Sequence, residues 1–122
     1  MRLLLDTHML LWALNDDPKL TLQARKAIRD AQDRIVSAVS IWEISIKRSI
    51  GKLRIEGDPI RFARAAGCAP LSVTWSHGDI AGALPAHHSD PFDRLLIAQA
   101  QSEGLTILTA DRAFWQYDVD LI

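Results

Sequence analysis

Four acidic residues lie beside apolar segments, where a carboxylate is costly unless it has a partner. Asp6 directly follows the leucines of LLLDTH, and Asp111 comes shortly after the apolar segment LTILT. Glu43 lies just beyond the segment RIVSA, and Asp93 lies near the start of DPFDRLLIAQA. Carboxylates that converge repel one another and raise each other's pKa unless a cation lies among them. Such a set of oxygen ligands suits Mg²⁺ or Mn²⁺.

A divalent cation held by carboxylates can lower the pKa of a bound water, orient a phosphodiester and stabilise the leaving oxygen. The residue types therefore favour one-step hydrolysis of a phosphodiester by an activated water. Each acid also has an ordinary structural explanation. Ser40 and Glu43 match a capping box, and Asp90 is placed to cap a helix that starts at Pro91. Asp93 and Asp111 could simply favour helix N-termini.

The elements that position these acids follow from the apolar pattern. Strands are expected at residues 2–6, 34–38, 70–73, 105–109 and 119–122. Helices are expected at residues 7–15, 21–32, 40–50, 58–67, 76–84 and 91–104, with a helical turn at 110–115. The strands are continuously apolar, which is typical of a sheet covered on both faces. The pattern predicts an α/β three-layer sandwich with a mainly parallel central sheet. Because ligands bind outside the carboxyl ends of parallel strands, all four acids should meet at one edge.

Composition narrows the class of protein. We expect a single domain over residues 1–122, since this length is enough for one core. A net charge of −1, from 14 basic and 15 acidic residues, excludes a strongly basic nucleic-acid-binding protein. The single cysteine, Cys68, excludes an internal disulfide and fits a reducing cytoplasm. No apolar run is long enough for a membrane span, so we expect a cytoplasmic protein.

Taken together, the motifs LLLDTH, SIWEI, HHSDPFDRLLIAQA and ILTADRAFWQY occur in an order that resembles the PIN-domain ribonucleases. They resemble more closely the VapC-type toxins of bacterial toxin–antitoxin pairs, over essentially the whole chain. The resemblance implies a PIN fold and an endoribonuclease that depends on Mg²⁺ or Mn²⁺. It places the acidic quartet of the family on Asp6, Glu43, Asp93 and Asp111.

The resemblance also implies a role for each of these residues. Asp6, Asp93 and Asp111 would be direct metal ligands, and Glu43 would ligate a second ion or act through water. Small hydroxyl residues at Thr7, Ser40 and Thr109 would support the acids by hydrogen bonds. Asp90 lies one helical turn before Asp93 and is a further candidate for the same cluster.

Partners follow from the same resemblance. The substrate would be RNA, with structured transfer or ribosomal RNA favoured. A cognate antitoxin would neutralise the toxin, and a homodimer is expected. The candidate RNA contacts are Lys47, Arg48, Arg94 and Arg112, although a solvated face or salt bridges to carboxylates would also explain these basic residues. His87 and His88 are expected to lie in a loop.

Two alternatives predict different properties. A phosphohydrolase of the haloacid-dehalogenase type also begins with an apolar strand that ends in Asp, but it needs a second Asp two residues later. His8 occupies that position here. A non-catalytic binding module would use the acids only as helix caps, and it would show neither a metal-dependent thermal shift nor RNA cleavage.

Overall fold

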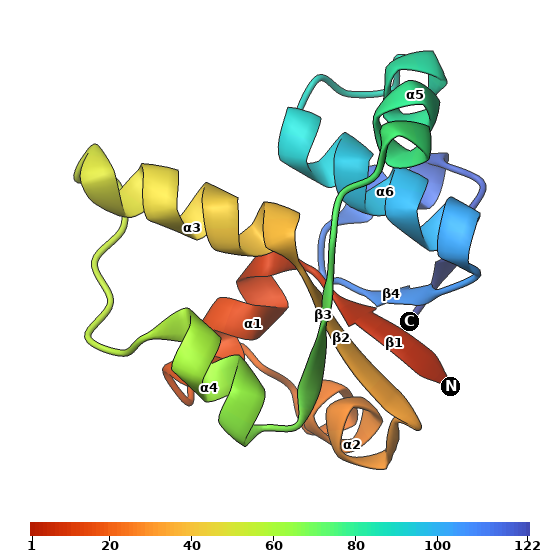
Figure 1. The fold of residues 1–122 in the computed structure, drawn as a ribbon. Coiled ribbons are helices and arrows are strands. Elements are labelled where there is room, and N and C mark those ends of the chain that lie inside the picture. The colour runs from red at the N-terminus through yellow and green to blue at the C-terminus, as the bar shows by residue number, and fades with distance from the viewer.

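Five parallel strands form the centre of the fold in the computed structural model, which describes residues 1–122 (Figure 1). The sheet has the order β3-β2-β1-β4-β5, and each neighbouring pair is parallel. The strands are β1 (Arg2–Leu5), β2 (Asp33–Ser37), β3 (Cys68–Leu71), β4 (Thr106–Leu108) and β5 (Asp120–Leu121). The central strand β1 is a run of leucines that are almost fully buried because helices cover both of its faces.

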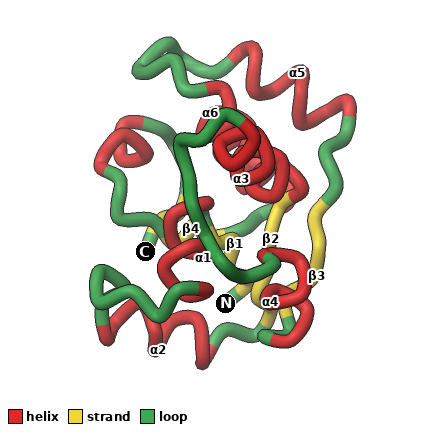
Figure 2. The backbone as a smooth tube through the Cα atoms, turned by 90° about the vertical axis from the view of Figure 1, so that its left-hand side faces the viewer, coloured by secondary structure: helices red, strands yellow, loops and turns green.

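Six α-helices and one 3₁₀ helix surround the sheet (Figures 1 and 2). They are α1 (Thr7–Leu14), α2 (Leu22–Asp30), α3 (Ala38–Ser49), α4 (Pro59–Ala65), α5 (Trp75–Ala83), α6 (Pro91–Glu103) and η1 (Arg112–Gln116). Helices α1, α2 and α4 lie on one side of the sheet, and α5 and α6 lie on the other, whereas α3 projects away from the end of β2 (Figure 1). The predicted three-layer sandwich with a parallel sheet is confirmed.

The core has one apolar cluster on the α6 side of the sheet and two on the α1 side. Leu4 of β1 packs with Leu96 and Ile97 of α6, whereas Leu3 and Leu5 pack on α1 and α2. The alternation of neighbouring leucines between the two faces follows from the two-residue repeat of a strand. Consequently β1 is fixed from both sides, and so is the residue that follows it. No helix combines the length and apolar composition that crossing a lipid bilayer requires.

The start of α3 differs from the sequence prediction. Ser37, the last residue of β2, caps this helix by accepting a hydrogen bond from Val39 N–H at 3.0 Å. The helix therefore begins at Ala38, and Ser40 and Glu43 lie inside it. The capping box proposed for Ser40 and Glu43 is wrong, because a serine nearer to the strand provides the cap. This correction removes helix capping as the explanation for Glu43.

Candidate active site

Asp6 leaves the sheet at the carboxyl end of β1. Its N–H donates to Leu108 O at 3.1 Å, and its Oδ1 accepts from Met9 N–H at 2.8 Å, so it also caps α1. The residue is only 3% exposed. Burial raises the pKa of Asp6, and the charge of Asp111 raises it further, while the Thr109 hydroxyl, Met9 N–H and His8 lower it. Asp6 is therefore a buried carboxylate with a second acid in range.

Asp93 lies in the first turn of α6, the helix that Asp90 caps by accepting from Asp93 N–H at 3.0 Å. Burial, together with the charges of four other acids, raises the pKa of Asp93 to about 7. In decreasing order of effect these are Asp90, Glu43, Asp111 and Asp6. The carboxylates predicted from strand and helix ends therefore act on one another at one edge of the sheet. Asp90 takes part in this coupling, although its own side chain serves as a cap.

Glu43 is buried, at 3% exposure, and each of its oxygens has a partner. The Thr7 hydroxyl donates to Oε1 at 2.7 Å and lies 3.0 Å from Ser40 Oγ. Lys47 Nζ, one helical turn further along α3, donates to Oε2 at 2.6 Å. Thr7 thus donates directly to an acid, whereas Ser40 contacts that acid only through Thr7. Glu43 differs from Asp93 in that a cation already neutralises it.

Asp111 is exposed and caps η1 by accepting from Ala113 N–H at 2.9 Å. Its own N–H donates to Thr109 Oγ1 at 3.0 Å. A hydroxyl that accepts from an amide keeps its proton to donate, and the Thr109 hydroxyl lowers the pKa of the neighbouring Asp6. Thr109 thus links the two strand ends that carry Asp6 and Asp111.

The donor set fits a hard divalent cation by its chemistry, because carboxylate oxygens dominate it and their charges are mutually repulsive. The raised pKa of Asp93 fits such a cation, because burial first and then the charges of the neighbouring acids disfavour its ionised form. No three Asp, Glu, His or Cys side chains lie close enough together to form a ready-made metal site. Repulsion among the acids opposes such an approach unless a cation lies between them.

The four candidate RNA contacts lie in different surroundings. Lys47 pairs with Glu43, while Arg48 is exposed and donates to Ile55 O at 3.5 Å. Arg112 is exposed, with its guanidinium 5.9 Å from the centre of the Trp115 ring. Of the four, Arg112 is the one whose charge faces solvent beside an acid of the site.

Arg94 requires a correction. Its guanidinium donates to the carbonyl oxygens of Ala81 (2.9 Å), Leu84 (2.9 Å) and Pro85 (2.8 Å), and also to His88 O at 3.4 Å. These bonds fasten the segment between α5 and α6. The side chain therefore contacts no carboxylate and is engaged with the backbone rather than turned toward RNA.

The sequence prediction missed two residues beside the acids. His88 and Tyr117 contact each other, and His88 also reaches Asp93 at 3.4 Å. The sequence placed His88 in a loop, which is correct, but gave it no role. The available signal was its position two residues before Asp90, the start of the DPFDR motif.

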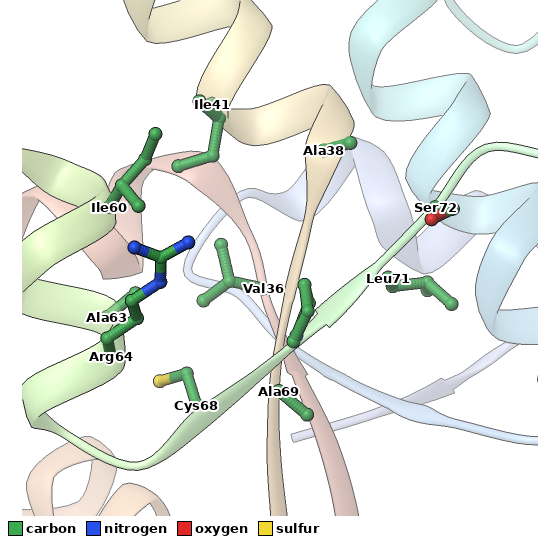
Figure 3. A pocket seen from close by; sticks show the side chains of 11 residues that line it. Val36, Ala38, Ile41, Ile60, Ala63, Arg64, Cys68, Ala69, Leu71 and Ser72 are labelled. Atoms are coloured by element: carbon green, nitrogen blue, oxygen red, sulfur yellow. The ribbon is translucent and has the colours of Figure 1, made fainter.

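An apolar cavity of about 300 Å³ lies apart from the acids, between α3, α4 and β3 (Figure 3). Val36, Ile41, Ile60 and Leu71 are among its lining residues, and none of the acidic quartet lines it. This apolar cavity is therefore separate from the acids.

A family model for the PIN domain matches residues 3–120. The chain belongs to the PIN-domain family. This PIN domain is 29% identical to Ribonuclease VapC22 of Mycobacterium tuberculosis over 112 residues, which cover 89% of this chain and 86% of that protein.

Solved structures share the same fold. One chain of the crystal structure of VapBC2 from Rickettsia felis, bound to a DNA fragment from their promoter, superposes with a TM-score of 0.73 at 14% identity. That match covers 100% of this chain and 98% of the other. DNA-bound VapBC from Salmonella typhimurium gives 0.72 at 15% identity, with coverage of 100% and 97%. Membership of the PIN family removes the haloacid-dehalogenase alternative, and His8, which stands where that class needs a second Asp, is exposed.

Proposed function

We propose that this PIN domain is an endoribonuclease that depends on Mg²⁺ or Mn²⁺ and acts as the toxin of a toxin–antitoxin pair. The observation that carries the proposal is the position of four acids beyond the carboxyl ends of the strands: Asp6 after β1, Glu43 in the helix after β2, Asp93 in the first turn of α6 and Asp111 after β4. Burial first, and then the charges of the neighbouring acids, raise the pKa of Asp93, which supports a cation among them. Similarity to a VapC ribonuclease over most of the chain supports the choice of RNA as substrate.

Asp6, Asp93 and Asp111 would hold the metal. When bound, a divalent cation supplies a water of lowered pKa and stabilises the charge on the leaving oxygen. Glu43 is a poor candidate for a direct ligand because Thr7 and Lys47 already occupy its oxygens. We assign to Glu43 a catalytic role through water, with its charge kept in place by Lys47. The exposed guanidinium of Arg112 would contact an RNA phosphate.

The reaction would be hydrolysis in one step. The oxygen of a water molecule bonds to phosphorus, the opposite P–O bond breaks, and the released ribose oxygen takes up a proton. Neither product end carries a 2′,3′-cyclic phosphate, because the ribose 2′-hydroxyl does not attack. Cyclic phosphate ends on the products would contradict this mechanism.

Incubation of the purified protein with total RNA tests the activity. We expect cleavage with Mn²⁺ or Mg²⁺, no cleavage with EDTA, and none with Asp6→Asn. Asp79→Asn is a matched control, since Asp79 is an exposed acid on α5 that makes no ion pair. Cleavage that continues in EDTA, or that Asp6→Asn leaves intact, would refute the metal-dependent proposal and point to a contaminating nuclease.

The proposal includes a protein partner. The structural neighbours are VapBC complexes, and this similarity of fold supports a cognate antitoxin here. The apolar cavity between α3 and α4, with Ile60 exposed at its rim, is a candidate contact for it (Figure 3). Co-expression with the protein encoded beside this chain should yield a complex that cleaves no RNA. Ile60→Asp should weaken that complex, whereas Ile50→Asp, at an exposed position outside the cavity, should not.

A further inference from the structure

A chain of side-chain contacts leads from the core to Asp93. The Tyr117 hydroxyl lies 2.6 Å from His88 Nδ1, and His88 Nε2 lies 3.4 Å from Asp93 Oδ2. The imidazole thus bridges a phenol and a carboxylate, with one ring nitrogen toward each. His88 and Asp93 have equally sheltered side chains, each 18% exposed.

The other neighbours of Tyr117 fix the direction of the protons along this chain. The phenolic oxygen also contacts His88 N–H at 3.2 Å and Arg94 Nη1 at 3.3 Å. Both of these groups are donors only, so neither can accept the phenolic proton. That proton must therefore go to His88 Nδ1, and the imidazole proton lies on Nε2, where it faces the Asp93 carboxylate.

Tyr117 is a rigid starting point for this chain. Its ring is 6% exposed and belongs to the core cluster on the α6 side of the sheet. It directly follows η1, the 3₁₀ helix that Asp111 caps. One short segment therefore carries an acid of the site at its start and the anchor of the histidine at its end. Through His88, this segment is joined to the helix that carries Asp93.

We propose that His88 is a positioning residue that orients the Asp93 carboxylate through Nε2–H, and that Tyr117 holds the imidazole in the tautomer this requires. The proposal rests on the assignment of Asp93 as a metal ligand in the proposed function. Hydrogen bonds to a ligating carboxylate fix its orientation, and loss of such a partner typically costs ten- to a hundredfold in metal affinity.

Two substitutions by amide side chains distinguish the contribution of Nε2 from that of Nδ1. Glutamine can place an amide nitrogen near the position of Nε2, so His88→Gln keeps a donor for Asp93. Asparagine ends near the position of Nδ1, so His88→Asn does not reach Asp93. His87→Asn is the matched control, because His87 packs edge-on against the Tyr117 ring at 4.9 Å but makes no side-chain hydrogen bond.

Calorimetric titration with Mn²⁺ in the absence of RNA measures the effect, with circular dichroism showing that each variant is folded. We expect His88→Asn to lower Mn²⁺ affinity about tenfold or more. The Mn²⁺ affinity of His88→Gln should remain closer to that of the wild type, and the affinity of His87→Asn should equal that of the wild type. Equal affinity of His88→Asn and wild type would overturn the proposal.

Nitrogen-15 NMR of the imidazole gives a second readout that a merely structural role would not determine. We expect His88 to be protonated at Nε2 in the wild type, and a proton on Nδ1 would overturn the proposal. Metal affinity that depends on His88 in a protein that cleaves no RNA would support the positioning role while refuting the proposed function. RNA cleavage by a protein whose metal affinity does not depend on His88 would support the proposed function and refute the positioning role.

Discussion

Glu43 and Asp93 show how two acids of one site differ in the charge that surrounds them. Glu43 has Lys47 Nζ at 2.6 Å and the Thr7 hydroxyl at 2.7 Å, so its negative charge is balanced inside the fold. The Asp93 side chain has only the long contact to His88 Nε2, and the charges of four other carboxylates raise its pKa. A cation from solution would therefore be attracted to Asp93 rather than to Glu43.

Lys47→Met tests whether Lys47 stabilises the buried carboxylate of Glu43. The change leaves a buried carboxylate with one partner fewer, so the free energy of unfolding should fall by about 1–2 kcal/mol. Chemical denaturation measures this value. Lys52→Met, at an exposed lysine without an ion pair, is the control and should change little. Equal stability of the two variants would show that Lys47 does not stabilise Glu43.

The pKa of Asp93 predicts a pH dependence of stability for the metal-free protein. A carboxyl group with a pKa of about 7 in the folded state and an ordinary pKa of 3.8 when unfolded binds its proton more tightly in the folded state. Stability should therefore fall as pH rises from about 4 to about 7, and then level off. The raised pKa of Asp6 acts in the same direction.

Thermal melting in EDTA from pH 4.5 to 8 measures this dependence. Asp93→Asn should melt at a higher temperature than wild type at pH 8 and should show a shallower fall between pH 4.5 and 7. Groups near Asp93 that also titrate or carry charge are Asp90, Glu43, Asp111, Asp6 and His88. A wild-type melting temperature that rises steadily through this window would contradict the assigned pKa.

At the scale of elements, strand ends and helix caps determine where the acids lie. Asp6, Asp90 and Asp111 each cap a helix, so the ordinary explanation of these residues is correct as far as the backbone is concerned. Capping does not exclude chemistry, since a cap at the carboxyl edge of a parallel sheet also points a carboxylate toward that edge. For Asp6 the two roles coincide.

The sequence predicted the parallel sheet and the order of the helices because continuous apolar strands and Asp-Pro helix starts are local signals. It misplaced the start of α3 because two serines, Ser37 and Ser40, compete for the cap, and the end of β2 decides between them. It missed the contact of His88 with Tyr117 because the two residues are 29 positions apart and meet only in the folded chain. Arg94 was misassigned because its partners are backbone carbonyls of the preceding segment, which no pattern of side chains in the sequence marks.

Arg94→Met and Arg112→Met should separate a structural arginine from a substrate contact. Loss of the Arg94 bonds to the segment between α5 and α6 should lower the free energy of unfolding by about 2–3 kcal/mol. Arg112→Met should leave stability nearly unchanged but weaken RNA binding and reduce its salt dependence. Denaturation and filter binding at several salt concentrations measure these effects. The assignments would be wrong if Arg112→Met lowered stability while Arg94→Met left stability unchanged and weakened RNA binding.

At the scale of the whole molecule, several large apolar side chains are exposed. Trp75 is 98% exposed, Trp42 is 59% exposed, and the apolar cavity opens between α3 and α4. Such surface is typical of proteins with partners. We propose a homodimer as well as an antitoxin complex, and light scattering should give a mass twice that of one chain. A monomer at micromolar concentration would contradict the proposed dimer without affecting the site.

Mapping of new RNA 5′ ends in cells after brief expression tests the central claim most directly. The protein should produce new ends concentrated at one or a few positions in one class of RNA, and Asp6→Asn should produce none, although it is present at the same level. Identical end profiles for the wild type and Asp6→Asn would contradict the assignment of this acidic site as the centre of an endoribonuclease.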